Sequence, residues 1–217
     1  MSLPESPRLY LLLDRSYLDE NGLLSLCEVA LAEGVRLLQY RDKSSGDKEF
    51  EALARRLAAA CSHAGATLIV NDRAPVAARL GLGLHVGQDD LSPALARSVI
   101  GPEAPLGIST HSLAQARAAF AEPVDYIACG PLYATGIKPK ASPVGLGLLE
   151  AVAAGSPVPV VGIGGITPER AGDVLRAGAD YVAVVSAVAA AKDPAAVIRR
   201  FIEIGEGFDD KRQRPLR

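Results

Sequence analysis

Residues 157–167 read PVPVVGIGGIT, and the architecture of the chain can be worked out from this stretch. Its first part, residues 158–162, is short, rich in valine and bounded by proline and glycine, which is typical of a buried strand. Glycines follow at once, and residues 168–177 have the composition and spacing of a helix. A strand, a glycine-rich turn and a helix in this order predict one βα unit of a parallel sheet.

The same unit repeats along the chain. An open doubly wound sheet shows the same alternation, but the first strand here is not followed by a G-x-G-x-x-G turn. We therefore predict an α/β fold, a single (β/α)8 TIM barrel over residues 1–217, with its core at about 8–204 and a polar tail at 209–217. The expected strands are 9–14, 35–41, 67–72, 83–87, 106–110, 126–130, 158–162 and 181–186, and the expected helices are 23–33, 48–63, 75–80, 93–100, 113–120, 146–154, 168–177 and 194–204.

Composition limits the partners. The 23 basic and 25 acidic residues are spread along the chain and give a net charge of -2, which favours neither nucleic acid nor an anionic membrane surface. There is no basic leader and no apolar run of the roughly 20 residues that a membrane span needs, so we expect a cytoplasmic protein. The three cysteines have irregular spacing that fits neither disulfides nor zinc. Small phosphorylated molecules are the expected partners, and a homo-oligomer is compatible with the sequence.

Polar residues gather where the predicted strands end. In a TIM barrel the carboxyl ends of the strands form the catalytic face. The regular placement of these clusters therefore predicts an active site at that face. They fall at residues 39–43, 71–73, 85–90, 109–111, 130–138, 162–165 and 185–186.

The cluster after the second strand carries positive charge. Gln39 and Arg41 alternate along the strand, so both side chains are expected to point into the barrel. A buried Arg41 either pairs with a barrel carboxylate or binds an anionic ligand. Because Lys43 follows with the same parity, we favour the ligand, and a guanidinium with an ammonium group suits pyrophosphate.

Two aspartates end neighbouring strands. Asp72 could cap the helix expected at residue 75, and Asp89 or Asp90 the helix expected at residue 93. Alternatively, Asp72 and Asp90 hold a hard cation. Because Arg41 and Lys43 are expected nearby, we favour a site in which these carboxylates and the substrate phosphates bind Mg²⁺.

The glycine-rich turn at residues 162–167 offers free backbone N–H groups ahead of a helix, which predicts a phosphate site. Val185 and Ser186, at the end of the last strand, are the expected partners of this turn. Of the histidines, His85 is interpreted as a core residue, whereas His111 is either an acid or base on the catalytic face or the start of the next helix.

Together these seven motifs resemble the thiamine phosphate synthase family from residue 9 to about residue 201. The family joins 4-amino-2-methyl-5-hydroxymethylpyrimidine diphosphate to 4-methyl-5-(2-phosphooxyethyl)thiazole and releases pyrophosphate. The resemblance implies that Asp72 and Asp90 ligate Mg²⁺. It implies that the pyrimidine diphosphate is held by Gln39, Arg41, Lys43, Asn71, Ser109 and Lys138, with Tyr40 and Asp42 in the same motif, and the thiazole phosphate by Thr135, Gly165, Val185 and Ser186, with Gly136 and Ile137 in the loop.

The implied mechanism needs no protein nucleophile. Arg41, Lys43 and Lys138 would stabilise the charge that develops on departing pyrophosphate, and Ser109 completes the catalytic group. Ile137 stands where the family usually has threonine, so the resemblance does not imply a hydroxyl contact to the thiazole phosphate at this position. Two alternatives stay open: a related thiazole tautomerase that uses His111 as acid or base, and a non-catalytic protein that binds thiazole phosphate.

Overall fold

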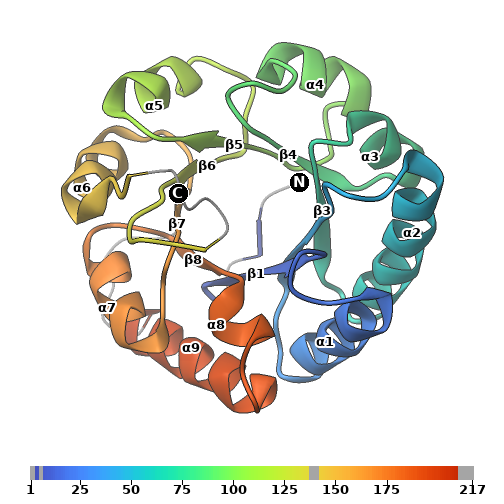
Figure 1. Cartoon of the computed structure of the whole chain (residues 1–217). Helices are drawn as coiled ribbons and strands as arrows, with labels where there is room; N and C mark the ends of the chain where they lie inside the picture. The colour runs from blue at the N-terminus through green and yellow to red at the C-terminus, as the bar shows by residue number, and fades with distance from the viewer. Residues whose placement is uncertain (1–2, 5–6, 137–141, 210–217) are drawn as a thin grey trace.

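The computed structural model describes residues 3–4, 7–136 and 142–209. Eight parallel strands follow one another around a closed barrel in the order β1-β2-β3-β4-β5-β6-β7-β8. Helices surround this barrel on the outside, and Figure 1 looks along its axis. The prediction of a TIM barrel is confirmed. Of the expected polar tail, residues 210–217 lie outside the described residues.

The strands lie within two residues of their predicted limits. They are β1 (Leu9–Asp14), β2 (Leu37–Arg41), β3 (Thr67–Asn71), β4 (Gly83–Val86), β5 (Leu106–Thr110), β6 (Tyr126–Cys129), β7 (Val160–Ile163) and β8 (Tyr181–Val184).

The prediction of eight helices was wrong, because the described residues form nine. Ser186, expected at the end of the last strand, instead begins the short helix α8. The chain leaves the extended conformation one residue earlier, at Val185 (φ -129°, ψ -83°). The helices are α1 (Glu20–Ala32), α2 (Asp47–His63), α3 (Ala74–Leu80), α4 (Pro93–Ile100), α5 (Leu113–Ala119), α6 (Gly145–Gly155), α7 (Pro168–Arg176), α8 (Ser186–Ala189) and α9 (Pro194–Asp209).

Alternation along the strands separates two apolar layers. In β1, Leu9, Leu11 and Leu13 belong to the layer between barrel and helices, whereas Tyr10 and Leu12 belong to the layer inside the barrel. Successive side chains of a strand point to opposite faces, so each strand contributes to both layers. The inner layer therefore also supplies the side chains that a ligand in the barrel mouth would meet.

The first and last strands close the barrel. β1 pairs with β8 in register from Leu9 opposite Val182 to Leu11 opposite Val184. Below this seam the guanidinium group of the buried Arg8 donates a hydrogen bond of 3.1 Å to the carbonyl oxygen of Asp180. Residues that are about 170 positions apart in the sequence thus hold the ring together.

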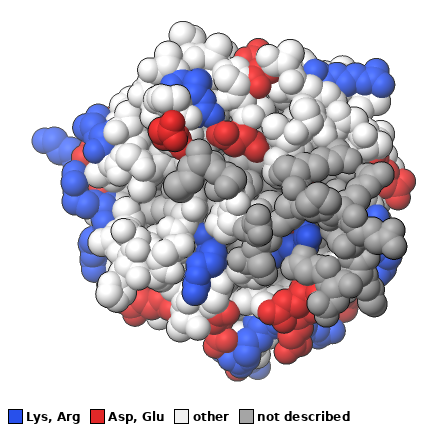
Figure 2. Space-filling view, turned by 180° about the vertical axis from the view of Figure 1, so that it is seen from behind, with Lys and Arg blue, Asp and Glu red and all other residues white. Residues whose placement is uncertain are grey.

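The outer surface carries charges of both signs. Acidic and basic side chains are interspersed on the face shown in Figure 2, so that face has no extended field of one sign. Among the described residues, no helix is both long and apolar enough to cross a membrane.

Candidate active site

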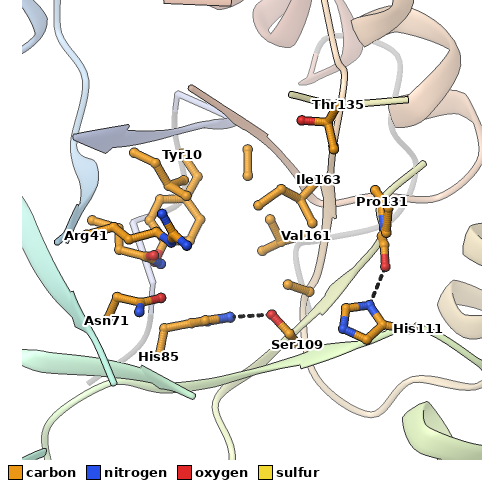
Figure 3. A pocket seen from close by; sticks show the side chains of 16 residues that line it. Tyr10, Arg41, Asn71, His85, Ser109, His111, Pro131, Thr135, Val161 and Ile163 are labelled. Carbon is orange, nitrogen blue, oxygen red and sulfur yellow. Dashed lines mark hydrogen bonds between the residues drawn. The ribbon is translucent and has the colours of Figure 1, made fainter. Parts of the chain in front are cut away.

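A pocket of about 110 Å³ opens in the barrel at the carboxyl ends of the strands. Figure 3 shows Arg41, Asn71 and His85 on one side of it and Pro131, Thr135 and Ile163 on the other. Polar side chains thus face an apolar wall. The lining residues are Tyr10, Leu12, Gln39, Arg41, Asn71, His85, Ser109, His111, Ala128, Gly130, Pro131, Thr135, Val161, Ile163, Gly164 and Ala183.

Gln39 and Arg41 of β2 both line this pocket, as their alternation predicted. Arg41 is also paired, because its Nη1 lies 2.6 Å from Oδ2 of Asp14 at the end of β1. The Asp14 side chain is fully buried, whereas the Arg41 side chain is 19% exposed. The two readings of Arg41 therefore do not exclude each other: a buried carboxylate anchors the guanidinium group at the pocket wall.

Tyr40 and Asp42 do not line the pocket, and their contact with substrate stays a prediction. Tyr40 has the opposite parity and packs outward, where its ring stacks on Phe50 of α2 at a centroid distance of 4.4 Å. Asp42 turns back to its own loop and accepts hydrogen bonds from the backbone N–H groups of Ser44 (2.8 Å) and Ser45 (3.0 Å). Both residues shape the loop that carries Lys43.

The same loop contacts lower the pKa of Asp42. Burial opposes this change, but the hydrogen bonds from Ser45 and Ser44 outweigh burial and hold the pKa below its ordinary value. Asp42 is therefore an ionised anchor of the β2–α2 loop.

Lys43, Asp72 and Asp90 come together at the rim of the barrel. The Lys43 ammonium group forms an ion pair with Oδ2 of Asp72, and the Asp90 carboxyl group lies near enough to Asp72 for each to shift the pKa of the other. Burial raises the pKa of Asp72; Lys43 opposes the rise, and Asp90 adds to it. Burial opposes a low pKa of Asp90, but the neighbouring Asp72 and the hydrogen bond from the N–H of Gly87 outweigh burial and lower it. The two carboxyl groups therefore titrate as a pair.

The alternative that these aspartates cap helices was wrong. Arg73 occupies the cap position of α3, which has no side-chain cap, and Ser92 caps α4. Asp72 itself has φ of 62°, a conformation that non-glycine residues seldom adopt. In this conformation the carboxylate lies beside Lys43 and does not cap α3.

The described residues contain no group of three or more histidine, cysteine or acidic side chains placed to hold a metal. Two carboxylates do meet, and magnesium is commonly held by one or two carboxylates together with substrate phosphates. Asp72 and Asp90 therefore fit a magnesium ion that a diphosphate helps to bind.

His111 lines the pocket from the β5–α5 loop. Its Nδ1 contacts the carbonyl oxygen of Gly130, which can only accept, so Nδ1 carries the proton. Its backbone N–H donates to Oε1 of Gln115 at 2.7 Å, while Ser112 caps α5. His111 thus precedes the helix cap, with Nδ1 held by Gly130.

A smaller pocket of about 30 Å³ adjoins the first at the ends of β7 and β8. Gly164 and Gly165 have φ of 102° and 64°, and a Cβ on Gly165 would lie 2.4 Å from the carbonyl oxygen of Ala134. Only glycine therefore fits at residue 165. All four residues expected around the thiazole phosphate line this pocket: Thr135, Gly165, Val185 and Ser186. Gly136 follows as an exposed residue, whereas Ile137 and Lys138 lie outside the described residues.

Tyr10 and Tyr126 lie inside the barrel beside the pocket, although no sequence motif pointed to them. The Tyr10 and Tyr126 hydroxyl groups are 2.9 Å apart, and Tyr126 also contacts Nδ1 of His85. His85, interpreted as a core residue, is buried and hydrogen-bonded, but it also reaches Ser109 in the pocket wall. The available signal was the inward parity of two tyrosines in otherwise apolar strands.

A closed parallel barrel with a polar pocket in its mouth and a glycine-walled pocket beside its last two strands defines a TIM-barrel enzyme. The family model for thiamine monophosphate synthase matches residues 9–188. The chain belongs to this family, as its motifs predicted.

Known relatives agree. A thiamine-phosphate synthase of Azorhizobium caulinodans is 44% identical over 195 residues, covering 89% of this chain and 92% of the relative. One of Moorella thermoacetica is 44% identical over 183 residues, covering 83% and 87%. Among solved structures, a thiamine phosphate pyrophosphorylase from Pyrococcus furiosus superposes with a TM-score of 0.85 at 30% identity, covering 92% of this chain and 96% of that one. These matches favour the synthase over the tautomerase and the non-catalytic binder.

Proposed function

We propose that the chain is a thiamine-phosphate synthase, a transferase that joins 4-amino-2-methyl-5-hydroxymethylpyrimidine diphosphate to 4-methyl-5-(2-phosphooxyethyl)thiazole. The bond between the pyrimidine methylene carbon and the diphosphate oxygen breaks, and pyrophosphate leaves with the electron pair. A bond then forms between that carbon and the thiazole nitrogen, which gives thiamine phosphate. The observation that carries the proposal is the cluster of Lys43, Asp72 and Asp90 at the rim of the pocket that Arg41 lines.

The basic residues would receive the leaving group. Arg41 is already oriented by Asp14, so little further ordering is needed when a phosphate oxygen approaches. Lys43 is 58% exposed and bound only at the rim, so its ammonium group can turn from Asp72 to the diphosphate. Lys138, outside the described residues, is assigned the same role by the resemblance of its motif.

Asp72 and Asp90 would hold Mg²⁺ against the diphosphate. When bound, the ion would neutralise negative charge that develops on the leaving group. Without the ion, the Lys43 ammonium group pairs with the Asp72 carboxylate. This pairing would partly neutralise the two aspartates until the substrate binds.

The acceptor would bind at the other wall. Thr135, Gly165, Val185 and Ser186 surround a space next to Ile163 and Ala183, which both pockets share. A phosphate there would leave the thiazole ring directed toward the first pocket, so that its nitrogen faces the pyrimidine. Asn71 and Ser109, together with Gln39, would hold the pyrimidine at the opposite side.

The reaction is tested by incubating the purified protein with both substrates and Mg²⁺ and measuring pyrophosphate and thiamine phosphate. We expect equal amounts of the two products, and none when Mg²⁺ is chelated. A tautomerase or a non-catalytic binder would release no pyrophosphate, and that result would rule out the proposed reaction.

We also propose that the protein acts in the cytoplasm on small phosphorylated molecules. The three cysteines are free and buried, which suits a reducing compartment.

A further inference from the structure

Five polar side chains from five different strands form a continuous chain of hydrogen bonds across the barrel interior. Nε2 of Gln39 lies 2.6 Å from the Tyr10 hydroxyl, which lies 2.9 Å from the Tyr126 hydroxyl. The Tyr126 hydroxyl lies 3.0 Å from Nδ1 of His85, whose Nε2 lies 2.9 Å from Oγ of Ser109. Figure 3 shows the last of these bonds. The chain begins and ends at residues that line the pocket, Gln39 and Ser109.

The middle of this chain is shielded from water. Tyr10 and Tyr126 are 1% and 0% exposed, and burial raises the pKa of both, so they remain neutral hydroxyl groups. The Tyr126 ring fills the space above Gly107 of the neighbouring strand, where a Cβ would lie 2.0 Å from Cζ of Tyr126. The missing side chain at Gly107 thus leaves room for the Tyr126 ring inside the barrel.

The donors and acceptors in this series of hydrogen bonds run in one direction, which Gln39 determines. The Nε2 group of Gln39 can only donate, so the Tyr10 oxygen accepts from it. The Tyr10 hydrogen must then go to Tyr126, since a buried hydroxyl hydrogen without an acceptor costs roughly 1–3 kcal/mol. Tyr126 in turn donates to Nδ1 of His85, which leaves the His85 proton on Nε2. Nε2–H donates to Oγ of Ser109.

We infer that this directed series of hydrogen bonds orients the Ser109 hydroxyl as a donor toward the pocket, and that Tyr10, Tyr126 and His85 are positioning residues for it. Oγ of Ser109 already accepts from His85, so its own hydrogen is left for a ligand. At the other end the bond from Nε2 to Tyr10 fixes the Gln39 amide, whose carbonyl oxygen is then available to accept from a ligand.

The ligand chemistry follows from these two ends. A donor on one wall and an acceptor on the other suit a heteroaromatic ring that carries an amino group and an unprotonated ring nitrogen. This inference rests on the proposed function. The series of hydrogen bonds would select the pyrimidine substrate in its neutral aminopyrimidine form, whose ring nitrogen can accept a hydrogen bond from Ser109. A ring that offers only donors would leave the Ser109 hydrogen unpaired.

The direction can be tested without any assay of activity. In the protein with ¹⁵N-labelled histidine, two-bond ¹⁵N–¹H correlation spectra identify the protonated ring nitrogen, and His85→Gln and His111→Gln assign the signals. We expect His85 as the Nε2–H form and His111, which donates to Gly130, as the Nδ1–H form in the same spectrum. An Nδ1–H form of His85 would mean that the chain runs the opposite way, and that result would overturn the inference.

The positioning role is tested by Tyr126→Phe, with Tyr181→Phe as the matched control. Tyr181 is buried in the same inner layer, but its hydroxyl donates to the carbonyl oxygen of Pro4. Loss of one hydrogen bond to the ligand predicts about a tenfold higher KM for the pyrimidine diphosphate in Tyr126→Phe. The KM for thiazole phosphate should stay within about twofold, because its proposed site lies at β7 and β8.

A double-mutant cycle completes the test. If Tyr126 acts through Ser109, adding Tyr126→Phe to Ser109→Ala changes the KM for the pyrimidine little further, whereas Tyr181→Phe contributes equally in both backgrounds. Equal losses for both substrates, or full additivity with Ser109→Ala, would reduce Tyr126 to a structural residue. If the wild-type protein makes no thiamine phosphate, the proposed function fails, and the histidine spectra still decide the direction of the chain.

Discussion

Oδ2 of Asp14 lies 2.6 Å from Nη1 of Arg41, at the ends of the adjacent strands β1 and β2. The other carboxylate oxygen of Asp14 accepts from the backbone N–H (2.9 Å) and hydroxyl (2.6 Å) of Ser16. The hydrogen bonds of this buried carboxylate thus hold the end of β1 to the Ser16 turn and to Arg41. The pair makes Arg41 a rigid part of the pocket wall.

Replacing Asp14 by asparagine should affect both stability and substrate binding. Arg41 would lose its counterion in a mostly buried position, and breaking such a pair costs roughly 3 kcal/mol. Urea denaturation should show this loss, and the KM for the pyrimidine diphosphate should rise by about tenfold. Asp173→Asn is the control, because Asp173 pairs with Arg176 on the exposed surface. A neutral effect of Asp14→Asn would contradict the anchoring role.

Asp72→Asn should remove turnover and keep the fold. Asparagine tolerates the φ of 62° at this position better than most residues, so the substitution tests the charge without adding strain. We expect pyrophosphate release to fall at least about 100-fold and to respond little to added Mg²⁺. Asp47→Asn, which alters an exposed carboxylate that pairs with Arg73, should retain activity. Normal turnover of Asp72→Asn would refute the metal assignment.

Gly165→Ala should weaken the thiazole phosphate site selectively. The added Cβ would meet the carbonyl oxygen of Ala134 at 2.4 Å in a backbone conformation that alanine avoids. Steady-state kinetics should show the KM for thiazole phosphate rising at least about tenfold and the KM for the pyrimidine diphosphate changing much less. Gly147→Ala on α6 has open space around its Cβ and should leave both constants unchanged. Equal effects on the two substrates would place the phosphate elsewhere.

The contribution of Asp42 to stability should depend on pH. Its pKa is lower in the folded protein than in the unfolded chain, so the ionised carboxylate stabilises the native state above about pH 4, and this contribution is lost as the pH falls further. Asp42→Asn should therefore unfold more easily than wild type at pH 7, by roughly 2 kcal/mol. The difference should shrink in urea titrations at pH 3 and below. A difference that is constant with pH would show that the charge is not involved.

The fold could be predicted from the sequence because the relevant signals are local. β1, β5 and α4 begin and end at the predicted residues, since apolar runs and flanking glycine or proline mark them. α8 could not be predicted, because four residues of SAVA continue the apolar composition of β8 without a helical period. α8 begins where the chain leaves the extended conformation at Val185.

The site could be predicted in part. Alternation along β2 placed Gln39 and Arg41 in the pocket and Tyr40 on the opposite face, against Phe50 of α2. The Asp14–Arg41 pair and the chain from Gln39 to Ser109 join side chains of different strands. Their partners depend on strand register, which composition and periodicity do not specify.

The β1–β8 seam has a consequence for synthesis of the protein. It joins the earliest strand to be translated with the latest, so the ring stays open until Val184 has left the ribosome. Until then β1 exposes unpaired backbone groups along one side, which can recruit other chains. Nascent chains that stall before β8 should therefore be the species that chaperones bind and proteases remove.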